Sequence, residues 1–458
     1  MKKNFIKNFV FFIILPSFLI IFSSCATNSN AGSQARVSGT KIQAAAQTLE
    51  QDQFYIINRD SFTERKLSNG IPVIIKKSFN QKNCVVRLVF DRTPTFSGLK
   101  NSGVEQVTLE LLKAGTKTYS PLYISSLEYT DATKFSGRVH CDYLEFEMNT
   151  VREKAPDMAS LLAQMLKAPL LNEEDFKEIL AFKKAELQKS DEGKNLLEKI
   201  YRDLNSIDSY YDIPFMTEES QIKYSDVVSC HRELVNASRI KILASGNFTD
   251  EDIAALIDSL NKNFSDIKSA KFSKKNTALK KFPMDELKKL RAASDEENRN
   301  AAIGVFTIPD IADDQYLSYG LMSLYLDDML YSQLKEKYSC AGDAGSGIVR
   351  AKPAFGTICI YDISQKKDVK PLVKDYIVQN MQTEQINKKL EQYKRIYTSV
   401  IQSCEFSASK SVEQMTLSLV YSGDAKSYIS KPFKISKLTA EDVKAAFDST
   451  VAEGICWY

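Results

Sequence analysis

The sequence predicts a duplicated α+β protein, in which each half has an antiparallel sheet with helices packed on one face. Three observations support this prediction. Strand-like and helix-like patterns follow one another along the chain. The segments Ile222–Val227 and Leu438–Val443 resemble each other, and each precedes a short apolar strand. A lysine-rich stretch at 268–300 separates the two copies as a solvated linker, so we assign the halves to residues 54–267 and 301–458.

Local patterns predict the elements of the first half. Asn69 and Gly70 stand between two apolar runs, which is a strong signal for a β-hairpin turn. Apolar residues at helical spacing predict an amphipathic helix over 103–114. Thr249, followed by two acidic residues, is typical of a helix start. We further expect strands at 85–90, 139–148 and 239–246, and helices at 156–167, 173–188 and 225–234.

The second half repeats this alternation of elements. A long apolar run predicts a helix over 316–335, and residues 372–398 predict two more helices. Another helix follows Leu438. The expected strands lie at 302–307, 355–361 and 454–457.

The first 24 residues have the composition of an export signal. Three lysines precede an apolar run at residues 9–22. The small residues before Cys25 resemble a bacterial lipobox, so Cys25 is the predicted lipidation site. An ordinary secretory signal and a short membrane anchor are the alternatives. Ala26 is not an acidic retention residue, which favours the outer membrane, and residues 25–53 have the composition of a flexible tether.

Composition excludes several function classes. Lys plus Arg number 61 and Asp plus Glu 58; without the three signal lysines the two counts are equal. A neutral protein offers no electrostatic attraction for nucleic acid or for a membrane surface. Seven cysteines remain besides Cys25, widely spaced and without a Cys-x-x-Cys pair, which argues against a disulfide framework.

Five segments resemble the insulinase/pitrilysin family of zinc peptidases, which includes the mitochondrial processing peptidases. They occur in family order and at family spacing: Leu67–Gly70, Gly103–Thr116, Leu171–Gln188, Ile213–Phe215 and Leu243–Phe248. The resemblance implies a processing-peptidase-like fold and covers nearly all of the mature chain.

The family's zinc chemistry is missing from the matching positions. In the family, a helix ending in Gly-Thr carries His-x-x-Glu-His. The resemblance places the first His at Gln106, the general base at Leu109, the second His at Glu110 and the third, carboxylate ligand at Glu186. Leu109 cannot accept a proton, and a Gln amide is a poor zinc ligand.

The chain's two histidines, His140 and His231, lie 91 residues apart and cannot supply the missing motif. We therefore expect no zinc cofactor and no catalytic residues. The neighbouring pairs His140-Cys141 and Cys230-His231 invite a metal site. Residues adjacent in a strand point to opposite faces, so His140 and Cys141 could not easily share a metal, and we interpret the two pairs as coincidence.

The resemblance also implies an Arg and a Tyr in the second half that hold the substrate in active relatives. These positions carry Lys335 and Gly342 here. Lysine does not reproduce the bidentate fork of arginine, so the substrate-holding positions are degenerate as well.

The predicted function is that of a catalytically inactive lipoprotein of the cell envelope, either a non-catalytic partner subunit or a peptide-binding scaffold. The family implies a partner that retains the zinc motif, or self-association, and extended peptides as ligands. One alternative is an active metallopeptidase with an unusual metal site at Gln106, Glu110 and Glu186. The other is a surface lipoprotein that uses the scaffold for structure or adhesion.

Overall fold

A computed structural model describes residues 61–78, 82–188, 192–292, 300–332, 334, 341–363 and 369–458. The predicted signal at 1–24, the tether at 25–53 with Cys25, and Lys335 lie outside these described residues. Within them, no helix has both the length and the apolar character needed to cross a bilayer.

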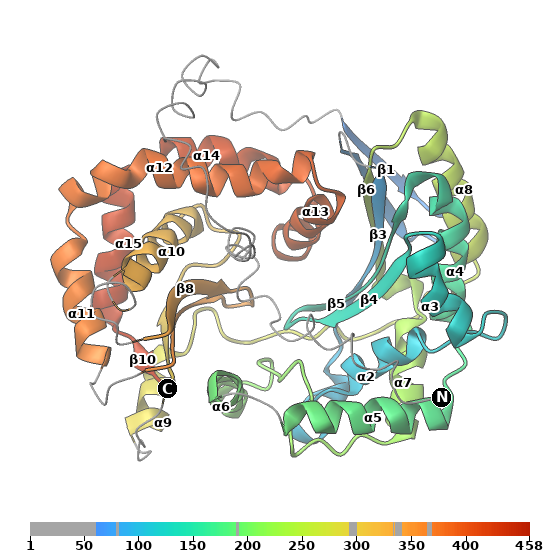
Figure 1. Cartoon of the computed structure of the whole chain (residues 1–458), viewed down its shortest axis with the longest axis horizontal. Helices are drawn as coiled ribbons and strands as arrows, with labels where there is room; N and C mark the ends of the chain where they lie inside the picture. The colour runs from blue at the N-terminus through green and yellow to red at the C-terminus, as the bar shows by residue number, and fades with distance from the viewer. Residues whose placement is uncertain are drawn as a thin grey trace, which may run out of the picture.

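The first half contains a six-stranded sheet in the order β1-β2-β6-β3-β5-β4 (Figure 1). Neighbouring strands are antiparallel except β2 and β6, which run parallel and so depart from the predicted all-antiparallel pattern. The parallel pair arises because the β1–β2 hairpin is added beside β6. The strands are β1 (Phe62–Lys66), β2 (Pro72–Lys77), β3 (Asn83–Asp91), β4 (Lys134–Val139), β5 (Tyr143–Val151) and β6 (Ile240–Gly246).

The second half contains a four-stranded antiparallel sheet in the order β10-β7-β9-β8. In both β10-β7-β9-β8 and β6-β3-β5-β4, the last strand in the chain lies beside the first, followed by the third and then the second. This shared topology confirms the predicted duplication. The β1–β2 hairpin belongs to the first copy. The strands are β7 (Ala302–Thr307), β8 (Asp343–Val349), β9 (Phe355–Tyr361) and β10 (Cys456–Trp457).

Helices surround both sheets. Those of the first half are α2 (Val104–Leu112), α3 (Pro121–Thr130), α4 (Ala155–Lys167), α5 (Glu173–Leu187), α6 (Glu192–Ile207), α7 (Tyr224–Leu234) and α8 (Asp250–Phe264). They are followed by α9 (Met284–Ala292), α10 (Tyr316–Leu330), α11 (Val369–Asn380), α12 (Thr383–Gln402), α13 (Ala408–Ser422), α14 (Lys431–Lys437) and α15 (Ala440–Glu453).

Most predicted elements are found within a few residues of their expected bounds, with three differences. The strand expected at 139–148 is instead the hairpin of β4 and β5, with His140 and Cys141 in its turn. The α-helix expected to reach residue 335 ends at Leu330. The stretch 268–300 is not only a linker, because it contains α9, whose Met284 and Leu287 are buried.

The two faces of the first sheet have different chemistry. Side chains alternate along β5, so Leu144 and Phe146 point to one face and Glu145 and Glu147 to the other. The apolar face packs on α4 and α8. The charged face, which we call the inner face, is directed toward the second half of the chain.

Each half contributes one helix to the other half. Helix α13, from the second half, packs on β3 and β6 from the inner face, opposite α4 and α8 (Figure 1). Helix α6, from the first half, buries Leu196, Ile200 and Leu204 in the core of the second half, beside β7. The predicted fold class is confirmed, but helices cover the first sheet on both faces.

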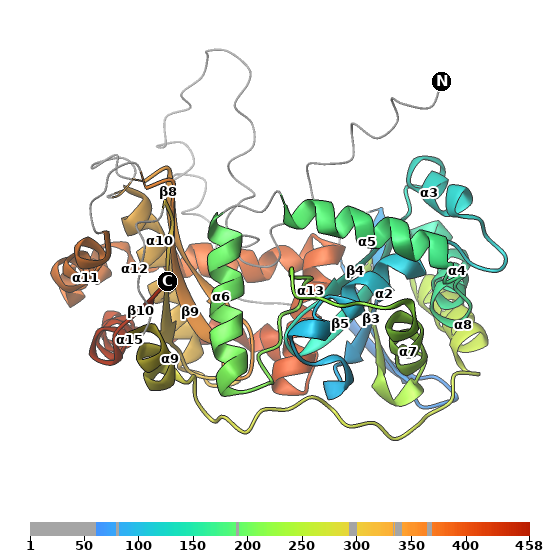
Figure 2. The same cartoon turned by 90° about the horizontal axis from the view of Figure 1, so that it is seen from below.

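An extended connection runs from α8 to α9 along one side of the molecule (Figure 2). Helix α9 then packs beside β10, where the first sheet has β2. The Arg291 side chain donates from Nε to the carbonyl oxygen of Trp457, 3.2 Å away. A helix that covers a sheet edge protects it from pairing with other chains.

Buried ion pairs join α13 and the preceding turn to the inner face. Arg87 on β3 lies 2.8 Å from Glu145 and 2.5 Å from Glu147, and it donates to the hydroxyl of Thr416 on α13 at 3.3 Å. Lys76 on β2 is fully buried and pairs with Glu405 at 2.9 Å. Charges removed from water in this way require their partners.

We expect Arg87→Ala to lower the free energy of unfolding by about 3–5 kcal/mol, because among the described residues it leaves the buried Glu147 without a cation and Glu145 with only the half-exposed Arg138. Arg138, which pairs with Glu145 at 3.2 Å but has a half-exposed side chain, provides the control. Arg138→Ala should cost less than about 1 kcal/mol. Thermal and denaturant unfolding of both variants measures the difference, and equal effects would contradict the assignment.

The same cluster predicts an acid-sensitive stability. Burial raises the pKa of Glu145, but Arg87, together with His140 and Arg138, lowers it to about 2. A carboxyl whose folded pKa is depressed stabilises the fold above its unfolded pKa of about 4.3 and loses this contribution as the pH falls. The stability difference between wild type and Glu145→Gln should therefore shrink by roughly 3 kcal/mol between pH 5 and about 2. A pH-independent difference would contradict this.

Candidate functional site

Helix α2, at the position of the family's zinc helix, is held between the first sheet and two other helices. It begins at Gly103, whose φ of 86° is left-handed and whose Cβ, if present, would lie 2.8 Å from Met216 backbone and side-chain atoms. Only glycine fits this start without displacing the neighbouring loop. The helix buries Val104, Val107 and Leu111 against α5 and α7.

Leu109, at the position of the family's general base, is a core residue. It is 1% exposed and belongs to the apolar core of the first sheet. Its Cβ lies 2.7 Å from the place where a Cβ on Gly137 would stand, so Leu109 packs directly on the backbone of β4. The side chain fills space between α2 and β4 and presents no proton acceptor.

The other matching positions do not form a metal-ligand set. Gln106 and Glu110 are partly exposed on α2, and Glu110 pairs with Lys113 at 2.5 Å. Glu186 on α5 pairs with Lys183 at 3.0 Å. Each carboxylate is thus bound to a lysine of its own helix. An amide, a leucine and two lysine-paired carboxylates do not fit a zinc ion, which prefers imidazole or thiolate ligands.

The two histidines lie elsewhere and have other partners. His140 stacks on Tyr143, with ring centroids 4.2 Å apart, and its Nε2 is 3.6 Å from Glu145. His231 on α7 contacts the carbonyl oxygen of Leu166 at 2.7 Å, and burial lowers its pKa. Within the described ranges, no three His, Cys, Asp or Glu residues are grouped to hold a metal.

The six cysteines that the structure describes are free thiols, consistent with the prediction that no disulfide framework exists. Cys141 contacts the Tyr201 hydroxyl at 3.7 Å, and burial raises the pKa of Cys230 to about 12. A buried thiol with a raised pKa is a poor metal ligand and a poor nucleophile. Cys141 and Cys230 therefore behave as small core residues.

Gly342, at the position of the family's substrate-holding tyrosine, has no room for a side chain. It immediately precedes β8, and its backbone N–H contacts the carbonyl oxygens of Tyr361 and Asp362 at 3.0 and 3.1 Å. A Cβ there would lie 2.6 Å from the Cβ of Asp362. A tyrosine would require the backbone to move.

Sequence patterns missed a buried polar network at the start of α2. Arg92 pairs with Glu105 of α2 and lies 3.6 Å from Asp212, which also pairs with Lys275 of the connection at 3.1 Å. Lys275 belongs to the lysine-rich stretch expected to be solvated, yet it is buried. Only its neighbours in the fold distinguish it from the exposed lysines around it.

Comparisons with known proteins agree with this geometry. Residues 221–397 match the family model described as the peptidase M16 inactive domain, M16 being the insulinase-like peptidases. No curated protein sequence matches the chain significantly.

Solved structures with the same fold include three bacterial proteins. A protease from Helicobacter pylori is 14% identical with a TM-score of 0.72, covering 86% of this chain and 96% of its own. A peptidase M16 inactive domain from Pseudomonas fluorescens is 16% identical with a TM-score of 0.68, covering 86% and 95%. The periplasmic protease PqqL from Escherichia coli is 14% identical with a TM-score of 0.64; 93% of this chain matches 48% of it.

We expect Leu109→Ala to destabilise the fold by about 2–5 kcal/mol, the usual cost of a cavity at a buried leucine. Glu110→Ala, one residue further along α2, should cost less than about 1 kcal/mol because its ion pair is partly exposed. Unfolding midpoints of the two variants provide the measurement. A neutral Leu109→Ala would show that this position is not part of the core.

Proposed function

Because the chain is a degenerate member of the insulinase-like M16 family, we propose that it is a non-catalytic subunit. In this proposal it pairs with a relative that retains His-x-x-Glu-His and contributes a surface that binds extended peptide. The single observation that carries the proposal is Leu109, buried against Gly137 where hydrolysis needs a base.

The missing base and the paired carboxylates both argue against hydrolysis. Removal of a positioned general base typically costs about 10²–10⁴ in rate. Zinc hydrolysis also needs a ligand set that lowers the pKa of a bound water. Glu110 and Glu186 could ligate a cation only after giving up Lys113 and Lys183. The alternative of an unusual metal site at Gln106, Glu110 and Glu186 has no support from this arrangement.

Strand β4 supports the peptide-binding part of the proposal. It is the last strand of the first sheet, so one side of its backbone has no neighbouring strand in the part of the chain that the structure describes. An extended peptide can add to such an edge through main-chain hydrogen bonds. Lys134 and Arg138 are exposed along β4, where each pairs with a carboxylate of this chain, Glu128 at 3.5 Å and Glu145 at 3.2 Å, so the edge has no strong charge preference of its own. The edge lies beside α2, as expected for a scaffold derived from a peptidase.

The cell envelope is the proposed location, with a lipid on Cys25 as the membrane anchor. The basic, apolar and small-residue regions at the N-terminus support export. One of the structures with this fold is described as a periplasmic protease, which is compatible with the same compartment. The outer membrane is favoured because Ala26 is not an acidic retention residue.

The function can be tested with purified protein that starts after the signal. We expect substoichiometric zinc, binding of a fluorescein-labelled unstructured peptide, and no cleavage of that peptide with or without a chelator. Glu110→Ala should leave peptide binding unchanged. Stoichiometric zinc and chelator-sensitive cleavage that Glu110→Ala abolishes would show an active peptidase instead.

The partner can be tested by affinity purification of the tagged full chain from its native envelope fraction. We expect a relative with an intact His-x-x-Glu-His to co-purify, and its peptidase activity to rise when the two chains are mixed. If the chain elutes without such a relative and also fails to bind peptide, a structural or adhesion role is favoured.

A further inference from the structure

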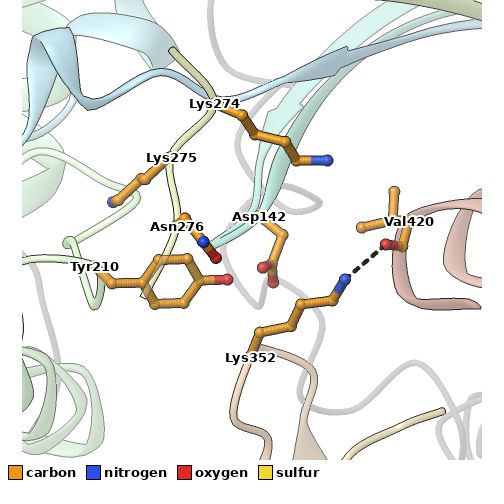
Figure 3. A pocket seen from close by; sticks show the side chains of 7 residues that line it. All are labelled: Asp142, Tyr210, Lys274, Lys275, Asn276, Lys352 and Val420. Atoms are coloured by element: carbon orange, nitrogen blue, oxygen red, sulfur yellow. Dashed lines mark hydrogen bonds between the residues drawn. The ribbon is translucent and has the colours of Figure 1, made fainter. Parts of the chain in front are cut away.

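A small cavity lies where the two halves and the connection meet (Figure 3). Its volume is about 260 Å³. Asp142, in the turn between β4 and β5, and Tyr210, in the loop after α6, come from the first half. Lys352, in the loop between β8 and β9, and Val420 on α13 come from the second half. The cavity is separate from the zinc-helix positions on α2.

The cavity places a carboxylate and an ammonium group opposite each other without pairing them. Asp142 is 8% exposed, and Tyr421 is its hydrogen-bond donor, at 2.9 Å; no ion pair to Asp142 occurs among the described residues. Lys352 donates to the neutral carbonyl oxygen of Val420 at 3.0 Å, and the described part of the chain gives it no carboxylate partner. A buried carboxylate such as Asp142 without a counter-ion is costly, and Lys352 beside it is only partly buried, so the ligand is indicated mainly by Asp142.

The hydroxyl of Tyr210 is a third unsatisfied group. Tyr210 is 3% exposed, and its hydroxyl has no hydrogen-bond partner within the described structure. Figure 3 shows this hydroxyl directed toward Asp142 and the cavity. A buried hydroxyl without a partner is uncommon in folded proteins and requires an explanation such as a ligand or a bound water.

We infer that this cavity binds a small neutral α-amino acid as a zwitterion. The ammonium group of the ligand pairs with Asp142 and donates to the hydroxyl oxygen of Tyr210. Its carboxylate pairs with Lys352, and a short apolar side chain contacts Val420. The cavity is smaller than most ligand pockets, which begin at about 300 Å³, so a small ligand fits best. The inference does not depend on the proposed partner function.

The other charged side chains that line the cavity already form ion pairs with carboxylates of the chain. Lys274, at the rim, pairs with Asp91 at 2.7 Å, and Lys275 pairs with Asp212 at 3.1 Å. Asp142 and Lys352 are therefore the two charges left for a ligand. Because these come from different halves, an occupied cavity ties the halves to each other and to the connection.

Calorimetric titration of the mature chain with L-alanine tests the inference, with acetate and ethylamine as probes that carry one charge each. We expect saturable binding of alanine, a raised melting temperature, and at least about tenfold weaker binding of either single-charge probe. Dialanine distinguishes a free amino acid from a peptide end: equal or tighter binding of dialanine would assign the cavity to peptides and overturn the amino-acid assignment. Acetate or ethylamine binding as tightly as alanine, or no saturation by about 10 mM, would overturn the inference altogether.

Three variants assign the contacts. Asp142→Asn and Lys352→Met should each weaken alanine binding about tenfold or more, since each removes one charge-assisted hydrogen bond. Tyr210→Phe should weaken binding while leaving the unliganded melting temperature unchanged or higher, because it removes only an unpartnered hydroxyl. Lys280→Ala, an exposed residue of the connection outside the cavity, is the matched control. If Tyr210→Phe lowers the unliganded melting temperature and leaves binding unchanged, the hydroxyl is structural and the inference fails.

The affinity should also depend on pH. Burial raises the pKa of Asp142 to about 6, although Tyr421, Lys352, Arg92 and Lys275 oppose the shift. Only the ionised carboxylate attracts the ligand's ammonium group, so alanine binding should weaken as the pH falls below about 6. Asp142→Asn should remove this dependence, and a wild-type affinity that is constant from pH 7.5 to 5 would contradict the assignment of Asp142.

Discussion

The packing of α13 on the inner face of the first sheet, around the buried Arg87 cluster, is the contact on which the arrangement of the two halves depends. Arg87 extends from the inner face of the first sheet, between two carboxylates of β5, and reaches Thr416 of α13. The same face carries Val85 and Val89, which share an apolar core with Val412 and Met415 of α13, so α13 is held by apolar packing as well as by the Arg87–Thr416 hydrogen bond. Helix α13 packs on the first half and helix α6 on the second half. The cavity lined by Asp142, Tyr210 and Lys352 lies at the junction between the two halves.

Helix α2, at the position of the zinc helix in the resembling family, is well packed but carries no zinc-binding chemistry. Its outer side packs on α5 and α7, and Leu109 packs on Gly137 of β4. In a peptidase this last position holds a carboxylate beside a metal, an arrangement that requires polar partners. A leucine at the same place needs only close packing, and the helix is held by apolar burial together with the buried Arg92–Glu105 ion pair at its start. The edge strand β4 lies beside it, where we propose that peptide binds.

The junction cavity and the α2 region differ in what they leave unsatisfied. At α2, every carboxylate at a family ligand position has a lysine partner, so no group there calls for a ligand. At the junction, Asp142, Lys352 and Tyr210 line the same cavity, but no hydrogen bond or ion pair joins any two of them among the described residues. The unsatisfied groups therefore point to a ligand in the cavity between the halves and not at α2.

The sequence by itself determined many of the helices and strands, the duplication and the absence of the zinc motif, but it did not predict α3, α6, β8, α13 or α14. Periodicity, the Asn69-Gly70 turn and the Thr249 cap act over a few residues, and the identities at Gln106, Leu109 and Glu110 need no fold to be recognised. The β4–β5 hairpin was missed because a turn without glycine or proline, at His140–Asp142, has no strong local signal.

Only the tertiary structure decided which charges are buried and which residues share a site. Lys275 and Lys274 are neighbours in a lysine-rich run, yet one is buried beside Asp212 and the other is exposed. Asp142, Tyr210 and Lys352 are separated by up to 210 positions and become neighbours only when α13 and the connection close over the first sheet. Which side chains are buried, and which ion pairs and hydrogen bonds they form, depends on packing between segments that are distant in the sequence. Short-range sequence patterns therefore do not predict them.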